Sequence, residues 1–143
     1  MYDLIGDIHG HCATLKKLLT QLGYELHQGV WQHRQRKIIF VGDYIDRGPQ
    51  IKETLDLVKT MVGAGQAIAL MGNHEYNAVA YATPDGRGDY FRKHNATHHK
   101  QHQATLQQFA QYPRGVAGLP PMVQNFAAVF RPRQPAGRAC LLG

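Results

Sequence analysis

The sequence predicts an α/β fold built on a parallel sheet, and three observations support that prediction. Short apolar runs that read as strands, at residues 2–5, 38–41 and 67–71, alternate with amphipathic stretches that read as helices. The middle run is continuous and β-branched, as in a central strand buried on both faces. Each run ends in glycine and polar residues. Because ligands bind beyond the carboxyl ends of parallel strands, we expect the functional site there.

The remaining elements are read from apolar periodicity, turn residues and helix-ending glycines. They are helices over residues 11–22 and 50–62, a short helix after Glu75 as far as residue 81, a helix over residues 98–112, and a β-hairpin over residues 24–36 with its turn at Gln28-Gly29. The pattern thus predicts one domain over residues 1–113.

The composition indicates an ordinary soluble domain. The chain has 143 residues, of which 43% are hydrophobic and 18% charged. No run approaches the roughly 20 apolar residues of a membrane span, and because the chain enters an apolar strand directly we expect no secretory signal. Cys12 and Cys140 lack metal-knuckle spacing and read as two reduced thiols, so we expect a cytoplasmic protein without a membrane partner.

The net charge of +6 leaves a nucleic-acid-binding module as an alternative. The excess is unevenly placed, because residues 114–143 contain four arginines and no acids, and residues 1–113 are nearly neutral. We therefore regard nucleic acid as an unlikely partner. The basic tail, rich in Pro, Gly and Arg, resembles out-of-frame translation, with a strand expected only at 126–130.

Three polar cassettes follow the three predicted strands, and they carry the chemistry. They are Gly6-Asp7-Ile8-His9-Gly10, Gly42-Asp43-Tyr44-Ile45-Asp46-Arg47-Gly48 and Gly72-Asn73-His74-Glu75. Taken singly, each cassette has a purely structural interpretation. The first would be two polar residues in a loop, the second a surface turn or ion pair, and the third a cap for the helix that follows. Three such cassettes in order, each after a strand, point instead to one shared site.

The donor atoms of the cassettes predict a metal centre. Asp7, His9, Asp43 and Asn73 offer carboxylate, imidazole and amide ligands, a mixture that suits Mn²⁺, Fe or Zn. Asp43 lies in the middle cassette and is the natural bridge between two cations about 3.5–4 Å apart. A hydroxide held between such metals is the expected nucleophile, since the metals lower its pKa.

Three further residues are candidates for catalysis and substrate binding. His74 follows the ligand Asn73 directly, so it can lie over the metals and protonate a leaving oxygen, with Asp46 to orient its ring. Arg47 offers a planar fork to two phosphate oxygens. The glycines allow sharp turns and a close approach of the backbone to the metals.

These motifs resemble the signature of the calcineurin-like metallophosphoesterases, in particular the phosphoprotein phosphatase branch, over roughly residues 2–112. That branch includes serine/threonine phosphatases and symmetrical diadenosine tetraphosphate hydrolases, and the third cassette is most similar to bacterial members. The resemblance implies the N-terminal part of a four-layer α/β/β/α sandwich holding two divalent metals, Mn most of all. It implies that Asp7 and His9 ligate the first metal, Asp43 bridges, Asn73 ligates the second, and Arg47 holds phosphate beside an acid dyad. The implied substrates are a phosphorylated small molecule, a dinucleotide or a phosphoprotein.

The chain departs from the family pattern downstream. The family takes two further histidine ligands and another arginine from a second half that nothing here matches. We therefore expect a truncated chain that keeps Asp43 and Asn73 for the second metal and holds one metal. An inactive remnant that binds one metal and phosphate is the alternative to an active phosphoesterase. We also expect a bare apolar surface that favours self-association.

The histidines at positions 94, 98, 99 and 102 leave one more question open. His98 and His102 are four residues apart and could share a metal on one helix face. The favoured interpretation is an exposed polar face of an outer helix.

Overall fold

A computed structural model of the chain describes residues 1–110. The expectations for residues 114–143, including the strand at 126–130, lie outside these described residues. Within residues 1–110, no helix is long and apolar enough to cross a membrane.

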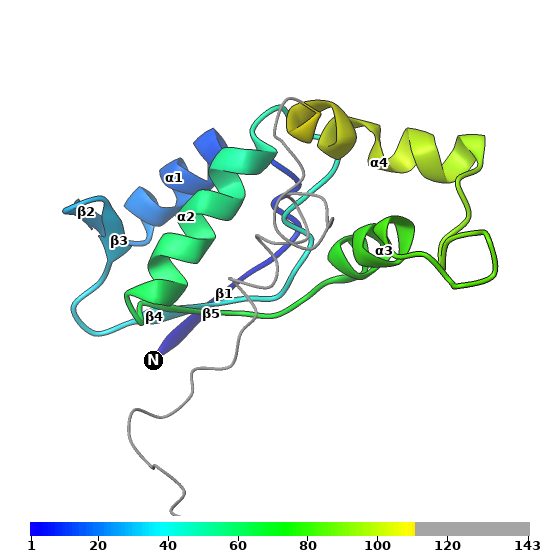
Figure 1. The fold of residues 1–143 in the computed structure, drawn as a ribbon. Helices are drawn as coiled ribbons and strands as arrows, with labels where there is room; N and C mark the ends of the chain where they lie inside the picture. Colours follow the sequence, from blue (N-terminus) through cyan, green and yellow to red (C-terminus); the bar gives the residue numbers. More distant parts are fainter. Residues whose placement is uncertain (111–143) are drawn as a thin grey trace, which may run out of the picture.

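The core of the fold is a three-stranded parallel sheet. Its strands are β1 (Tyr2–Ile5), β4 (Lys37–Phe40) and β5 (Ala67–Ala69), in the order β1-β4-β5. Strand β4 pairs in parallel with both neighbours, so the continuous apolar run does form the central strand. All three carboxyl ends therefore lie at one edge of the sheet, as the alternating pattern predicts (Figure 1).

Two helices cover one face of this sheet (Figure 1). Helix α1 spans Cys12–Gln21 and helix α2 spans Ile51–Gly63, each buried along its apolar side. Between them in sequence, β2 (Glu25–His27) and β3 (Val30–Gln32) form the predicted hairpin. Its turn residues Gln28 and Gly29 both have positive φ, 49° and 81°, the geometry that a two-residue hairpin turn requires.

The other face of the sheet carries exposed apolar side chains. Leu4, Ile39 and Ile68 are paired across the three strands and so point to the same side. Leu4 is 70% exposed and Ile68 48%, whereas Ile38 and Phe40, on the helical side, are fully buried. This is apolar surface of the kind that the sequence predicts.

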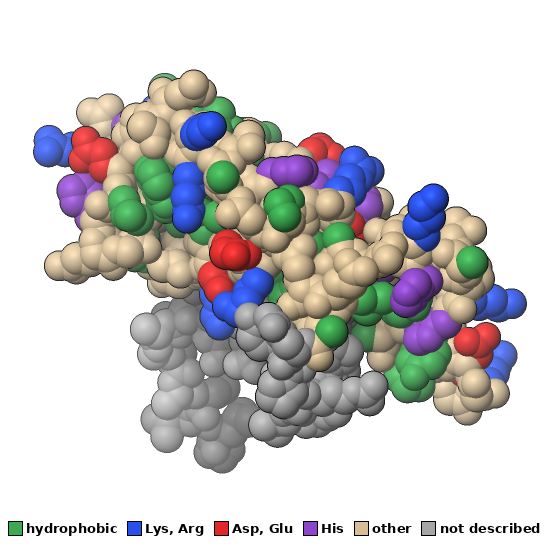
Figure 2. Space-filling view, turned by 90° about the horizontal axis from the view of Figure 1, so that it is seen from above, with side chains coloured by type: hydrophobic (Ala, Val, Ile, Leu, Met, Phe, Trp, Pro, Cys, Tyr) green, Lys and Arg blue, Asp and Glu red, His purple; other side chains and the backbone are tan. Residues whose placement is uncertain are grey.

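The last two helices lie beyond the carboxyl edge of the sheet. Helix α3 spans Asn73–Ala82 and starts directly at the third cassette. Helix α4 spans Ala96–Phe109, and its N-cap is Asn95, whose side chain accepts a hydrogen bond from the amide of His98. In Figure 2, histidine side chains lie mostly over the half of the molecule that contains α4, whereas Lys and Arg side chains are spread over the whole face. Helix α4 is not an exposed polar helix, because His102, Thr105 and Phe109 are buried along one side.

Candidate active site

The three cassettes meet at the carboxyl edge of the sheet and are joined by backbone hydrogen bonds. The amide of His9 donates to the carbonyl of Asp43 at 2.9 Å, and the amide of Gly10 donates to the carbonyl of Tyr44 at 2.7 Å. In return, the amide of Gly48 donates to the carbonyl of His9 at 2.8 Å. The first and second cassettes therefore form one connected piece of backbone, as their positions after neighbouring strands predict.

Two glycines make this close approach sterically feasible. A Cβ atom at Gly48 would lie 2.3 Å from the carbonyl oxygen of His9. A Cβ at Gly42, whose φ is +102°, would lie 2.4 Å from the backbone of Gly72, the first residue of the third cassette. Any side chain at either position would push two cassettes apart.

Ligand atoms for a metal lie together at this edge. One donor atom each from His9, Asp43 and His74 lies within 4.8 Å of the others. His9 is buried and donates from Nδ1 to the carbonyl of Ile45 at 2.8 Å, which leaves Nε2 with its lone pair. That nitrogen lies 3.7 Å from a carboxylate oxygen of Asp7, whose side chain is 84% exposed. A histidine held through one nitrogen and open at the other is the usual arrangement of a metal ligand.

Asn73 lies at the start of α3 and lines the same pocket as His74, so it shares the edge of the sheet with the other predicted ligands. The grouping of donor atoms differs from the sequence expectation in one respect. His74, predicted as an acid, is in the compact group with His9 and Asp43. The donor set as a whole fits a divalent metal with mixed oxygen and nitrogen ligands.

Backbone strain is concentrated in the first two cassettes. Among the described residues, six non-glycine residues have positive φ, and five are in these cassettes: Asp7 (52°), His9 (45°), Asp43 (57°), Asp46 (68°) and Arg47 (63°). Left-handed backbone is unfavourable for residues with a Cβ atom, by about 1 kcal/mol or more each. Such strain persists only where the surroundings hold it, and it is typical of functional sites.

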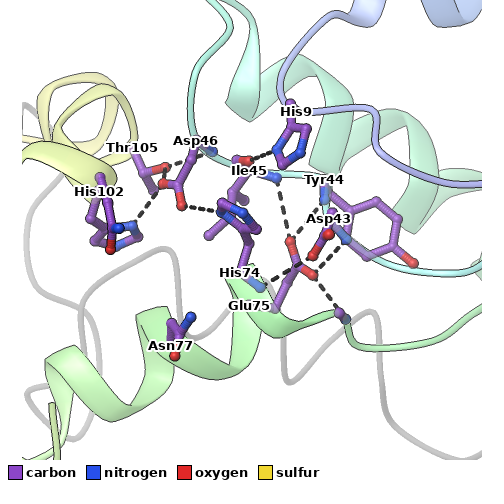
Figure 3. A network of polar contacts seen from close by, with 12 residues as sticks. His9, Asp43, Tyr44, Ile45, Asp46, His74, Glu75, Asn77, His102 and Thr105 are labelled. Atoms are coloured by element: carbon purple, nitrogen blue, oxygen red, sulfur yellow. Dashed lines mark hydrogen bonds and ion pairs between the residues drawn. The ribbon is translucent and has the colours of Figure 1, made fainter. Parts of the chain in front are cut away.

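Asp46 is a buried carboxylate between two histidines (Figure 3). One oxygen, Oδ2, accepts from Nδ1 of His74 at 2.7 Å; the other, Oδ1, accepts from Nδ1 of His102 at 2.7 Å and from the hydroxyl of Thr105 at 2.5 Å. Burial alone would raise the pKa of Asp46, but the hydrogen bonds from His102, Thr105 and His74 and the charge of His102 together hold it below its usual value. The carboxylate is thus kept ionised, and it fixes the ring of His74 with Nε2 turned away from Asp46.

His102 and Thr105 were not predicted as part of the site. Both come from α4 and reach the second cassette more than fifty residues away in sequence. Thr105 also accepts from the amide of Asp46 at 3.0 Å, so it holds both the backbone and the side chain of that residue. Of the buried side-chain polar atoms in residues 1–110, Nε2 of His102 is the one without a hydrogen-bond partner. Within residues 1–110, the group of donor atoms close enough to hold a metal is formed by His9, Asp43 and His74 and includes neither His98 nor His102, so the structure gives no support to a metal site shared by these two histidines.

Glu75 is a third residue that the sequence did not assign to the site. Its side chain is fully buried and accepts from the amides of Asp43 at 2.9 Å, Tyr44 at 2.8 Å and Ile45 at 3.3 Å. It also accepts from the amide of Gly72 at 3.0 Å, which is the capping contact expected for this helix start. One carboxylate therefore caps α3 and anchors the whole turn that carries Asp43 (Figure 3).

A large open pocket adjoins these residues. It has a volume of about 1000 Å³, extends between α3 and α4, and includes Asp46, Arg47, Asn73 and His74 in its lining. Arg47 is exposed, as the prediction of a phosphate-binding fork requires. The predicted site residues are therefore brought to one edge, with Asp7 at its exposed rim and Asp46 at its buried side.

Comparison with known proteins agrees with this geometry. The bis(5'-nucleosyl)-tetraphosphatase PrpE (asymmetrical) of Oceanobacillus iheyensis is 44% identical over 73 residues, which is 50% of this chain and 29% of that protein. The protein of the same name from a Geobacillus species is 45% identical over 73 residues, 50% of this chain and 30% of its own length. The chain thus spans less than a third of the length of these curated relatives.

Solved structures share the fold. A cold-active protein tyrosine phosphatase, determined at 1.1 Å, superposes with a TM-score of 0.52 over 89% of this chain and 36% of its own, at 24% identity. The enzyme of a psychrophilic Shewanella species gives a TM-score of 0.53 over 89% of this chain and 37% of its own, at 21% identity. At such identities the likeness concerns the fold alone. A family model for the calcineurin-like phosphoesterases matches residues 2–125, and the chain belongs to that family.

Proposed function

We propose that this chain carries the metal-binding and acid–base part of a phosphoesterase that hydrolyses a dinucleoside polyphosphate or a phosphomonoester. The observation that carries the proposal is the meeting of two features at one edge of the sheet. Atoms of His9, Asp43 and His74 that are able to ligate a metal lie within 4.8 Å of one another, and His74, the member of this group proposed as the acid, is held by the buried carboxylate of Asp46.

In this proposal, Asp7 and His9 hold the first metal, Asn73 holds the second, and Asp43 lies between them. A pair of divalent metals supplies Lewis acidity and lowers the pKa of bound water. The tautomer of His9 supports its role, because Nδ1–H is committed to the carbonyl of Ile45 and Nε2 is left to bind. Manganese is the proposed metal, as the family resemblance implies, and iron and zinc are the alternatives that the same mixed oxygen and nitrogen donors fit.

His74 is the proposed proton donor to the leaving oxygen. Its Nδ1 is occupied by Asp46, so a proton can be delivered only from Nε2. The carboxylate of Asp46 orients the ring by accepting from Nδ1, so that Nε2 is the atom left to face the leaving oxygen. Arg47, exposed at the rim of the pocket, is the proposed phosphate-binding residue.

A dinucleoside polyphosphate is the favoured substrate, because the curated relatives bear the name bis(5'-nucleosyl)-tetraphosphatase. A phosphoprotein is the less favoured alternative, since the likeness to protein tyrosine phosphatases rests on the fold. Nucleic acid is not among the substrates in this proposal.

A chain that binds one metal and phosphate without turnover is the second candidate. The observation in its favour is that, among the predicted ligands, Asp43 and Asn73 alone are left for a second metal. The two candidates predict different metal contents per chain and different rates.

The test is Mn²⁺-dependent hydrolysis of a chromogenic phosphomonoester and of a bis(5'-nucleosyl) tetraphosphate, with metal content measured on the same samples. We expect Asp43→Asn to abolish turnover and to lower the metal content. The matched control is Asp56→Asn, which removes an aspartate paired with Lys52 on α2. One bound metal without turnover would favour the remnant, and turnover that survives Asp43→Asn would overturn the proposed centre.

A cytoplasmic location and self-association complete the proposal. The described cysteine, Cys12, is a buried free thiol, as in a reducing compartment. The exposed apolar side chains of Leu4 and Ile68 support association of two copies through the sheet face. Sedimentation of the chain and of Leu4→Lys tests this, and a monomer at all concentrations would contradict it.

A further inference from the structure

The pocket between α3 and α4 extends well beyond the residues proposed for metal binding and acid–base chemistry. On α3 it is lined by His74, Asn77 and Tyr81, which share one face of the helix because they are three and four residues apart. At about 1.5 Å per residue, this face runs for roughly 10 Å from His74. Helix α4 and Arg92 form the opposite side. The pocket is therefore longer than a single phosphate group requires.

The charge of this pocket is positive. Arg47, Arg92 and Lys100 are among its lining residues, and of the described residues that line it the one acid is Asp46. Both oxygens of Asp46 are engaged in hydrogen bonds, one from His74 and one from His102. Among the lining residues that the structure describes, therefore, no carboxylate stands opposite the cationic groups along the outer part of the pocket.

Arg92 is fixed in the pocket by neutral groups. It donates from Nη1 to the side-chain oxygen of Asn77 at 2.7 Å and from Nη2 to that of Gln101 at 2.9 Å. Amide oxygens orient a guanidinium without neutralising it, so the charge of Arg92 remains available to an anion. Asn77 lies one turn along α3 from His74, about 4.5 Å by the rise of the helix.

The segment that carries Arg92 is itself well ordered by aromatic stacking. The ring of His94 lies between Tyr81 and Tyr90, with centroids 3.9 Å and 4.0 Å away and both pairs nearly parallel. The amide of Arg92 donates to the carbonyl of Ala80 at 3.0 Å. Arg92 therefore lies on a loop that is held in place by these contacts.

We propose that this outer part of the pocket, with Arg92 and Lys100, is a subsite for the phosphate groups next to the one being hydrolysed. It would select a polyphosphate chain over a phosphomonoester. The inference rests on the proposed function, since it takes the attacked phosphate to lie beside His74 and Arg47. The next phosphates of a linear chain would then lie toward Arg92, which contacts Asn77 one helical turn along α3 from His74, and toward Lys100 on α4.

The test is equilibrium binding of inorganic tripolyphosphate and of orthophosphate to the 143-residue chain, by calorimetry in chelator so that metals do not contribute. We expect the chain to bind tripolyphosphate at least tenfold more tightly than orthophosphate. Arg92→Gln should weaken tripolyphosphate binding by about tenfold, and Lys100→Gln by about threefold to fivefold, with less than a twofold change for orthophosphate.

Two controls separate charge from folding. Arg92→Lys keeps the charge and should recover part of the affinity lost in Arg92→Gln, whereas a loosened loop would leave both variants equally weak. Lys59→Gln removes an exposed lysine from α2, outside the pocket lining, and should bind as the parent does. Equal affinity for the two anions, or Arg92→Gln and Lys100→Gln variants that bind like Lys59→Gln, would overturn the subsite.

These experiments distinguish failure of the subsite from failure of the proposed function. If hydrolysis depends on Asp43 while tripolyphosphate binding ignores Arg92 and Lys100, the subsite alone is wrong. If binding depends on these two residues while the chain shows neither metal nor turnover, the subsite stands and the proposed hydrolysis is wrong.

Discussion

Replacing Glu75 by glutamine tests whether one buried carboxylate holds the turn that carries Asp43. Its oxygen Oε1 accepts from the amides of Tyr44 and Ile45, and Oε2 accepts from the amides of Asp43 and Gly72. Glutamine has the same shape but replaces one oxygen by an NH₂ group. Whichever way the amide is turned, two backbone donors face another donor.

The expected cost follows from those two lost acceptors. A hydrogen bond to a charged group contributes about 1.5–3 kcal/mol, and a buried donor left unsatisfied costs a similar amount, so Glu75→Gln should lower the free energy of unfolding by about 3–5 kcal/mol. That is a large share of the roughly 5–15 kcal/mol of an ordinary domain. Metal affinity should fall as well, although Glu75 lies behind the turn, because Asp43 would lose its fixed position.

Urea denaturation followed by circular dichroism measures the first effect, and Mn²⁺ titration calorimetry measures the second. The matched control is Glu53→Gln, an exposed carboxylate in the first turn of α2, for which we expect a change within about 0.5 kcal/mol. If Glu75→Gln were as mild as Glu53→Gln, the four backbone contacts would not be holding the turn, and the reasoning would be refuted.

Three other variants test the packing and the electrostatics of the same edge. Gly48→Ala should destabilise the chain by about 3 kcal/mol or more in urea, because its Cβ would meet backbone, whereas Gly63→Ala, with nothing within 4 Å, should cost nothing. Asp46 has a lowered pKa in the folded state, so its ionised form stabilises the fold above the unfolded value of about 3.9. The stability difference between the parent and Asp46→Asn should therefore shrink as the pH falls below about 4, and a difference that grows with acid would contradict the assignment. Tyr44→Phe should cost about 1–2 kcal/mol in thermal or urea unfolding, since it removes the hydroxyl that donates to the carbonyl of Leu70 at 2.7 Å; an unchanged stability would show that this bond contributes nothing.

The sequence was sufficient for the sheet and for the position of the site. Apolar runs and their spacing predicted three parallel strands, and the cassettes after them had to share an edge. The contact between His74 and Asp46 was also predicted, from the need of an acid for an orienting partner, and the structure places the two at 2.7 Å. These features depend on local pattern plus the topology of βαβ units, which a single sequence carries.

The contribution of α4 could not be read in the same way. His102 and Thr105 are polar residues among other polar residues, and the local pattern predicted that the histidines lie on an exposed polar face of this helix. Their burial depends on where α4 packs, which is a long-range contact with the turn after β4. One signal was available. His102, Thr105 and Phe109 are three and four residues apart and therefore share one face of α4, and this is the face that contacts the buried Asp46.

The turn at residues 43–48 shows why the site needs all three surrounding segments. Its backbone is left-handed at three non-glycine positions, a conformation that costs free energy unless its polar groups are held. The amides of 43–45 are accepted by Glu75 of α3, the amide of residue 46 by Thr105 of α4, and the amide of residue 48 by the carbonyl of His9. These supports come from the first cassette, α3 and α4, and together they hold the turn, with Asp43 in its left-handed conformation.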